Sequence, residues 1–241
     1  MLEELNEEAN KVGLKMNLSK TKIMTNIDDD RQMKIGDTVI DRVDSYVYLG
    51  HKLILGLDNQ TAEIKRRIGL GWAAFGKLSL IFKSKMNNSL KRKVFDRCVL
   101  PVLTYGAETL TLTKASENKL RVAQRAMERS MLGITLRDKM TNQWIRQQTK
   151  VVDVMERIAF LKWSWAGHIA RRTDDRWTKA IMDWRPPTTR PVGRPPERWT
   201  NGVKKYIKGT YGHTNWQQVA MDRTTWKNLG EAYIQQWIQT G

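Results

Sequence analysis

The chain has 241 residues, which is enough for one large domain or two small ones. Its 42 Lys and Arg against 25 Asp and Glu give a net charge of +17, which excludes an ordinary neutral metabolic enzyme as the default. Such a charge favours a polyanionic partner, nucleic acid before an anionic membrane. Cys98 is the one cysteine, so no internal disulfide can form and a reducing compartment is expected.

Charge and tryptophan are unevenly distributed along the chain. Residues 1–50 carry seven Lys and Arg and ten Asp and Glu, a net of −3, whereas residues 51–241 carry a net of +20. Nine of the ten tryptophans lie between Trp144 and Trp237. The acidic N-terminus has no signal-peptide core, and no stretch reaches the roughly 18 apolar residues of a membrane span. We expect an intracellular protein, in the nucleus, the cytoplasm or both, with no membrane partner.

The first part of the chain predicts one helix and several short strands. Helical spacing of apolar residues covers Leu2, Leu5, Ala9 and Val12. Segments 33–35 and 38–43 flank Gly36-Asp37, which is typical of a hairpin turn. Segments 22–26 and 45–55 are also β-prone. A helix packed on a hairpin-bearing sheet accounts for this pattern.

From Thr61 onward, apolar residues recur every three or four positions, which is the spacing of an α-helix. One stripe comprises Ile64, Ile68, Trp72, Phe75, Leu78 and Phe82. A second helix starts near Ser89, with Leu90, Val94 and Cys98 on one face, and Pro101 should kink or end it. A third helix is capped by Thr113 or Ser116, and its apolar face is Leu120, Ala123, Met127 and Met131.

The last hundred residues predict further helices around a proline-rich break. The cleanest stripe is Val151, Val154, Ile158, Leu161, Trp165 and Ile169. Segment 185–198 carries five prolines and must be a loop or linker. Segments 197–208 and 224–239 are the final helix candidates. The fold class is therefore α+β and mostly α-helical.

Three arginines repeat at every fourth residue of the third helix. Arg121, Arg125 and Arg129 form one cationic line, which is either a solvated helix face or a surface that follows phosphates. Similar basic clusters favour the second interpretation: Lys65, Arg66 and Arg67, then Lys91–Lys93, then Arg171 and Arg172.

The proline-rich segment contains Gly193-Arg194-Pro195, flanked by Arg190 and Arg198. A Gly-Arg-Pro core can lie in a narrow A·T minor groove, but a match of three residues is short, and an ordered surface crossover is the favoured alternative. Trp199 can stack on a base or pack onto a helix. Neighbouring tryptophans at helical spacing, such as Trp163 and Trp226, are expected to build a core.

No motif of an enzyme active site stands out. The carboxylate clusters at 28–30 and 174–175 have the ligand type that Mg²⁺ prefers, but their polar context is typical of solvated loops. The chain has no P-loop, nucleophile elbow or His–Glu metal motif.

Several segments nevertheless resemble a known family. Gly13–Lys22 (GLKMNLSKTK) is similar to motif D of a reverse transcriptase palm, and Tyr46–Gly50 (YVYLG) is similar to motif E, the primer grip. The likeness continues through Val94–Thr113, Arg121–Ile134, Leu161–Arg171 and Val192–Trp199. These strings resemble the C-terminal third of non-LTR, LINE-type retrotransposon polymerases of the RTE type, and they cover nearly the whole chain.

The resemblance implies a domain order. Residues 1–55 would end the palm, 56–135 would form a helical thumb, and 136–185 would form a helical C-terminal domain. A Pro/Arg-rich linker, 186–198, would precede C-terminal helices at 199–241. The expected partners are an RNA/DNA hybrid or duplex DNA and template RNA.

The resemblance also implies residue roles. Lys20 corresponds to the motif D general acid, and Tyr48, Leu49 and Gly50 to the primer grip. The residues expected to contact nucleic acid are Lys65, Arg66, Arg67, Arg121, Arg125, Arg129, Arg171, Arg172, Arg190, Arg194, Arg198 and Trp199. The family's paired metal-binding aspartates are absent, so Lys20 would be idle, no Mg²⁺ would be held and the chain alone would be inactive. The alternatives are a polymerase fragment and a stand-alone basic helical nucleic-acid-binding protein derived from such an element. A protein–protein scaffold is disfavoured by the charge.

Overall fold

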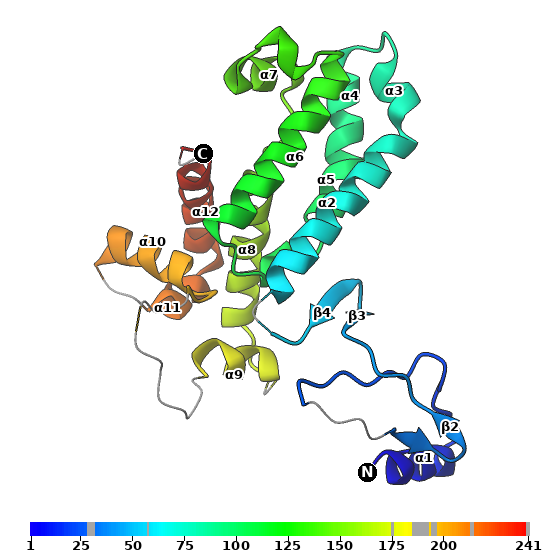
Figure 1. Ribbon diagram of the computed structural model, residues 1–241. Coiled ribbons are helices and arrows are strands. Elements are labelled where there is room, and N and C mark those ends of the chain that lie inside the picture. Colours follow the sequence, from blue (N-terminus) through cyan, green and yellow to red (C-terminus); the bar gives the residue numbers. More distant parts are fainter. Residues whose placement is uncertain are drawn as a thin grey trace. The chain divides into compact units, whose positions relative to one another are not determined.

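The computed structural model describes residues 1–27, 32–56, 58–174, 176–184, 193, 197–212 and 215–239. The chain divides into two compact units, residues 1–66 and 67–241. The boundary falls inside helix α2 (Asn59–Lys77), whose first turns belong to the first unit. Figure 1 follows the elements along the chain.

The first unit consists of a helix and two antiparallel hairpins. Its elements are α1 (Leu2–Lys11), β1 (Lys34–Ile35), β2 (Thr38–Val39), β3 (Ser45–Tyr48) and β4 (His51–Ile54). The predicted Gly36-Asp37 turn joins β1 to β2, and Gly36 has the positive φ of 56° that such turns require. No residue of α1 is buried, although its apolar residues have the predicted helical spacing. The first unit therefore has a small core, which includes Ile35 and Ile40.

The β3–β4 hairpin turns at Leu49-Gly50, where both residues have positive φ, 48° and 75°. Left-handed backbone at both central positions is the signature of a type I′ turn, which Asn-Gly normally occupies. Leucine adopts this conformation at a cost of about 1–2 kcal/mol. Glu63 of α2 is fully buried beneath the hairpin and accepts a 2.7 Å hydrogen bond from the Lys52 backbone N–H.

The second unit is helical throughout its described part. After α2 come α3 (Ser79–Lys83), α4 (Asn88–Val94), a π-helix (Phe95–Val99), α5 (Leu100–Leu103), α6 (Lys114–Leu132) and α7 (Asn142–Thr149). Then follow α8 (Val154–Ala170), α9 (Trp177–Asp183), α10 (Asn201–Tyr211), α11 (Trp216–Met221) and α12 (Arg223–Gln239). Two short 3₁₀ turns lie at Ala107–Thr109 and Leu136–Asp138.

Helix α6 begins at one of the two capping residues that the sequence predicts. The Thr113 side chain accepts a hydrogen bond from the Ser116 backbone N–H, and Gly133 closes the helix with φ 70°. The buried face of α6 includes the predicted Leu120, Ala123, Met127 and Met131. Apolar periodicity and capping residues therefore locate this helix correctly.

Two predicted faces need correction. The stripe that starts at Ile64 is divided, because α2 ends at Lys77 and α3 begins at Ser79, and Trp72 is left 38% exposed. In α4 and the π-helix the buried residues are Lys91, Phe95 and Val99, whereas Leu90 and Cys98 are exposed. The buried face therefore lies one residue further along the chain than predicted, and its spacing of four residues continues through the π-helix. Pro101 lies in the first turn of α5 and does not end the helical run.

The core of the second unit has two aromatic clusters. In the first, Phe75 stacks on Phe82 with centroids 4.4 Å apart, and Phe95 meets both rings edge-on. The second joins α8 to the C-terminal helices α10, α11 and α12, with Trp163, Trp216, Trp226 and Tyr233 buried at its centre. The prediction that Trp163 and Trp226 are core residues is confirmed. Trp165 and Trp237 are half-buried.

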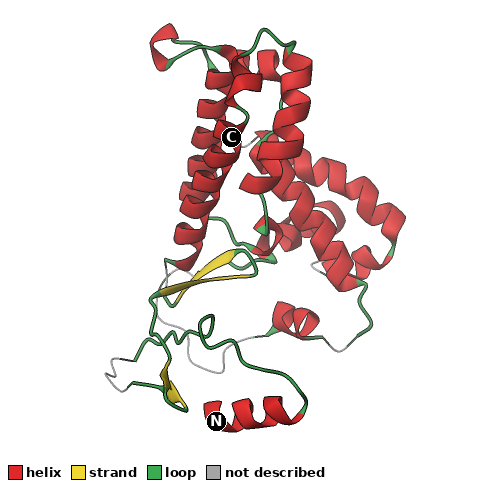
Figure 2. Ribbon diagram, turned by 90° about the vertical axis from the view of Figure 1, so that its right-hand side faces the viewer, coloured by secondary structure: helices red, strands yellow, loops and turns green. Residues whose placement is uncertain are grey.

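The fold class is α+β and mostly helical, as the sequence predicts. Figure 2 shows strands only in the two hairpins of the first unit, among the residues that the structure describes. In the described part of the chain, no helix is both long enough and apolar enough to span a membrane. The last helices begin at Asn201 and Arg223, a few residues from their predicted starts, and α7, α9 and α11 were not predicted.

Candidate functional site

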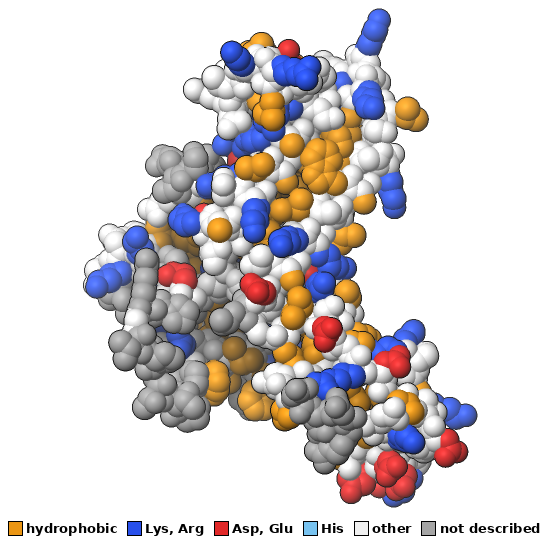
Figure 3. Space-filling model, in the orientation of Figure 1, with side chains coloured by type: hydrophobic (Ala, Val, Ile, Leu, Met, Phe, Trp, Pro, Cys, Tyr) orange, Lys and Arg blue, Asp and Glu red, His pale blue; other side chains and the backbone are white. Residues whose placement is uncertain are grey.

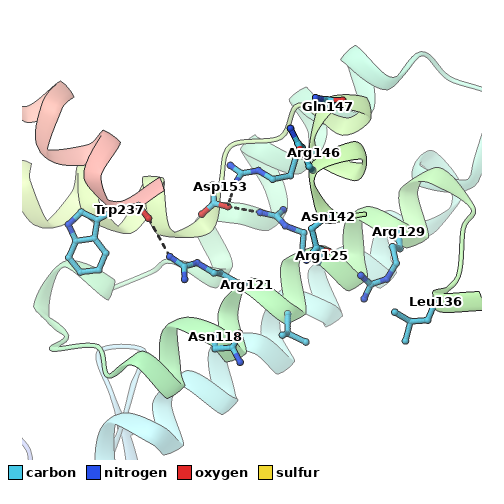
Figure 4. A pocket seen from close by; sticks show the side chains of 12 residues that line it. Asn118, Arg121, Arg125, Arg129, Leu136, Asn142, Arg146, Gln147, Asp153 and Trp237 are labelled. Carbon is cyan, nitrogen blue, oxygen red and sulfur yellow. Dashed lines mark hydrogen bonds and ion pairs between the residues drawn. The ribbon is translucent and has the colours of Figure 1, made fainter. Parts of the chain in front are cut away.

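A groove of about 870 Å³ lies in the second unit, along α6. Four arginines and four side-chain amides line it, together with one carboxylate and an apolar rim. Figure 4 shows Arg121, Arg125 and Arg129 on α6, Arg146 on α7 and Trp237 on α12. The residues are Asn118, Arg121, Val122, Arg125, Arg129, Leu136, Asn142, Gln143, Arg146, Gln147, Asp153 and Trp237. A concave surface so rich in N–H donors suits an anionic ligand.

The three arginines Arg121, Arg125 and Arg129 of α6 do not form one uniformly exposed charged face. Arg125, predicted to face solvent and contact phosphates, is only 7% exposed. Its guanidinium donates to the Glu128 carboxylate and, over 2.6 Å, to Asp153. Two carboxylates hold this cation inside the protein, so the predicted role of Arg125 as a phosphate ligand is corrected to a structural one.

The acidic partners are held in place by further polar contacts. The Thr149 hydroxyl donates to Glu128 over 2.7 Å, and Arg146 pairs with Asp153 at 3.3 Å. Asp153 also caps α8 by accepting from the Met155 backbone N–H. Burial raises the pKa of Glu128, and the neighbouring Arg125 charge opposes that shift only in part. This network ties α6, α7 and α8 together at the floor of the groove.

Arg121 and Arg129 carry positive charges that the carboxylates of this network do not neutralise. Both are half-buried, and the described part of the chain places no carboxylate within 4 Å of either. The Arg121 guanidinium donates to the Trp237 backbone carbonyl over 3.3 Å, near the C-terminal end of α12. A cation at that end of a helix is favourable. These two arginines flank Arg125 by one turn on either side and present N–H donors to the groove.

The predicted palm residues lie in the first unit. Lys20 is exposed, and its backbone carbonyl accepts from the Tyr46 hydroxyl over 3.1 Å. Lys22 forms a 2.5 Å ion pair with Asp41. Tyr48, Leu49 and Gly50 form the tip of the β3–β4 hairpin, with Tyr48 58% and Leu49 76% exposed. The three residues that resemble a primer grip therefore occupy a protruding turn.

The cluster at 65–67 separates into three environments. Lys65 is exposed, whereas Arg66 donates to the Gly50 carbonyl over 3.0 Å and also contacts Glu63. Arg67 is only 5% exposed, and its guanidinium lies over the Tyr105 ring at 4.6 Å. Arg66 and Arg67 thus have structural partners, and the cluster is not one cationic patch.

The C-terminal candidates are also divided. Arg171 donates to the Ala220 carbonyl over 2.7 Å, and Arg172 lies 3.4 Å from His168 Nε2. Arg198 is exposed and donates to the Trp184 carbonyl. The Trp199 indole N–H donates to the Glu108 carbonyl over 2.6 Å, which favours the packed alternative for this residue. Arg190 and Arg194 lie outside the described residues.

The sequence did not single out Arg146 or the groove amides. Arg146 belongs to α7, a short helix capped by Thr141, and its place beside Arg125 depends on the shared partner Asp153. The only local sequence signal for that helix is Thr141, followed by a polar segment that contains a tryptophan. Among the described residues, no three His, Cys, Asp or Glu side chains gather closely enough to hold a metal ion.

The basic charge of this surface is spread over the helical unit. On the face that Figure 3 shows, Lys and Arg side chains are scattered over the helices, while acidic side chains gather around α1. The fold and the groove together define a basic, mostly helical α+β protein with an arginine-lined cleft.

The comparisons with known proteins give its family. A transposon-derived protein of Caenorhabditis elegans is 37% identical over 240 residues, covering 94% of this chain and 86% of the relative. The chain therefore belongs to a family of transposon-derived proteins. No protein-family model matches the chain, and no solved structure matches it significantly.

Proposed function

We propose that this transposon-derived chain is the palm end, thumb and C-terminal region of a non-LTR retrotransposon reverse transcriptase, and that it binds nucleic acid through the α6 groove. The transposon origin shared with the nematode relative supports the first part, together with the motif D-like and motif E-like strings. The observation that carries the second part is the pair Arg121 and Arg129, whose charges the described carboxylates leave uncompensated.

The spacing of these arginines suits a phosphate backbone. Eight residues of α-helix separate Arg121 from Arg129, a rise of about 12 Å along the helix axis. Successive phosphates of one strand rise by about 3.4 Å, so the two guanidiniums can contact different phosphates of the same strand. Asn118 and Asn142 line the same groove and supply amide donors and acceptors for sugar or base edges. The buried Arg125 network holds the helices that carry these groups.

In this proposal the first unit supplies the primer-contacting hairpin. Tyr48 and Leu49 are exposed at its tip, and Lys20 is exposed on the same unit. Lys20 would act as a general acid only beside a metal-bound leaving group. The sequence offers no paired aspartates in the family's pattern, so no step of nucleotide addition is assigned to this chain alone.

Binding to a labelled primer–template hybrid tests the groove. The double variant Arg121→Gln/Arg129→Gln should weaken binding by about tenfold or more at 0.1 M salt, because two phosphate contacts are lost. Lys205→Gln/Lys208→Gln on α10 is the matched control, since both lysines are exposed and the same charge is removed from the same unit. Equal weakening by the two pairs would show that overall charge, and not the groove, drives binding.

The second candidate is a stand-alone nucleic-acid-binding protein derived from such an element. The high basic charge of residues 51–241 supports this candidate as much as it supports the polymerase fragment. A primer-extension assay with Mg²⁺ or Mn²⁺ separates both from an active enzyme. Either candidate predicts no templated incorporation by this chain, and extension of the primer would contradict both.

A further inference from the structure

A second cleft, of about 540 Å³, lies between α8 and α12 and shares no lining residue with the α6 groove. Its cationic side is formed by Arg171 and Arg172, which follow α8, and by Arg223 and Lys227 of α12. Its apolar side is formed by Phe160 and Ile234. The cleft thus has a charged half and a hydrophobic half.

The cationic half has little acidic compensation. Glu231 also lines the cleft, but no described carboxylate lies within ion-pair distance of Arg171, Arg172, Arg223 or Lys227. Burial and the neighbouring Arg223 charge lower the pKa of Arg171, which reflects the cost of gathering these cations. An anionic ligand would remove that repulsion. The clustering therefore indicates a site for a negatively charged group.

The apolar half offers an aromatic ring to that ligand. Phe160 is 46% exposed, and the Arg157 guanidinium lies 5.4 Å from its centroid. Trp163 and Trp226 also line the cleft, and these two buried rings stack on each other. A volume of this order matches pockets that hold small molecules of a few hundred daltons. One nucleotide has both an aromatic base and a phosphate, and it fits this division.

We propose that the α8–α12 cleft binds one nucleotide unit of a single-stranded nucleic acid, with the base against Phe160 and the phosphate beside Arg172, Arg223 and Lys227. In a duplex the base faces are covered by their stacked neighbours, whereas an unpaired base can meet an aromatic side chain. The cleft therefore selects single strands. This inference rests on the proposed function only in taking nucleic acid as the ligand, because it uses a different surface.

Anisotropy of a fluorescent eight-nucleotide oligouridylate tests the cleft in the full chain. Phe160→Leu should weaken its binding about fivefold or more, since one stacked base is lost, and should leave duplex binding unchanged. Arg223→Gln/Lys227→Gln should weaken oligouridylate binding and reduce its salt slope by about 0.7, the value for one lost phosphate contact on a single strand. Lys205→Gln/Lys208→Gln is again the charge-matched control, and unfolding curves verify that each variant is folded.

A second readout locates the base directly. Oligouridylate carrying 5-iodouridine should photocross-link to the peptide that contains Phe160, and Phe160→Leu should abolish that product. Cross-links confined to other peptides, or equal loss of binding in the control, would overturn the proposal. Competition by polyglutamate as strong as that by oligouridylate would also overturn it, in favour of an acidic protein partner.

Each of the two proposals can be refuted without affecting the other. If Arg121→Gln/Arg129→Gln leaves duplex binding intact, the groove assignment is wrong, whereas the single-strand losses from the cleft variants still stand. If the cleft variants leave oligouridylate binding intact, the groove assignment is unaffected.

Discussion

Trp163 and Trp226 hold each other in a reciprocal arrangement between α8 and α12. Their rings stack with centroids 3.8 Å apart, and each indole N–H donates to the backbone carbonyl of the other residue, over 2.8 and 3.1 Å. Each ring also covers a glycine of the opposite helix, Trp226 over Gly167 and Trp163 over Gly230. A buried indole N–H needs a hydrogen-bond acceptor, and in this pair each residue supplies the acceptor for the other. The contact fixes the two helices that form the second cleft.

The glycines in this arrangement should tolerate no side chain. A Cβ on Gly230 would lie 2.8 Å from the Trp163 ring, so Gly230→Ala should destabilise the chain by about 1–3 kcal/mol through overpacking. Gly209→Ala on α10 is the control, because nothing lies within 4 Å of its Cβ position and alanine favours a helix. Urea unfolding measures both variants. A loss of stability in Gly209→Ala as large as in Gly230→Ala would contradict the packing argument.

Arg125 and Arg129 should differ sharply although they occupy successive turns of α6. Arg125→Gln leaves the buried Glu128 and Asp153 without their cation and should cost about 3–5 kcal/mol of stability. Arg129→Gln removes a half-buried arginine without an acidic partner among the described residues and should change stability by less than about 0.5 kcal/mol. Chemical denaturation compares them. Similar midpoints for the two variants would be inconsistent with the buried network.

Lys162 should make stability depend on pH in the alkaline range. Burial lowers its pKa to about 8, against an unfolded value of 10.5, although Glu197 and Glu117 oppose the shift. Between these values the unfolded chain binds more protons, so stability should rise with pH, by up to about 3 kcal/mol.

Lys162→Met should remove this rise, which unfolding curves between pH 7.5 and 10.5 would detect. Lys119→Met is the control, because Lys119 is exposed on α6 and its charge stays in water. Parallel pH profiles for wild type and Lys162→Met would refute the assignment.

Leu49 should be replaceable by a residue that suits its backbone. Its φ of 48° is unfavourable for leucine and well tolerated by asparagine, so Leu49→Asn should stabilise the β3–β4 hairpin by about 1 kcal/mol. Amide hydrogen exchange at Tyr48 and His51 should slow about fivefold. Leu55→Asn is the control, since Leu55 is exposed but does not have positive φ. Unchanged or faster exchange in Leu49→Asn would mean that the turn is not strained.

Local chemistry predicted those elements whose boundaries are set by neighbours in sequence. Thr113 and Gly133 delimit α6 through their own hydrogen bonds and backbone angles, and Gly36-Asp37 closes the first hairpin. The short helices α7, α9 and α11 were missed because six to eight residues give too little periodicity to recognise. Their stability depends on packing and not on propensity.

The candidate site was predicted only in part, because burial depends on residues that are distant in sequence. Arg121, Arg125 and Arg129 are equivalent in a helical projection. Only the folded chain brings Asp153 within reach of Arg125 and so removes that arginine from the surface. Trp163 and Trp226, 63 residues apart, were predicted to be buried, but their reciprocal hydrogen bonds follow from helix packing alone.

Salt dependence of binding tests the central claim most directly. The logarithm of the association constant for a primer–template duplex should fall linearly with the logarithm of salt concentration. Arg121→Gln/Arg129→Gln should make that slope shallower by about 1.8, at roughly 0.9 per lost phosphate contact. A wild-type affinity that does not change with salt, or a slope that the double variant leaves unaltered, would contradict nucleic-acid binding through the α6 groove.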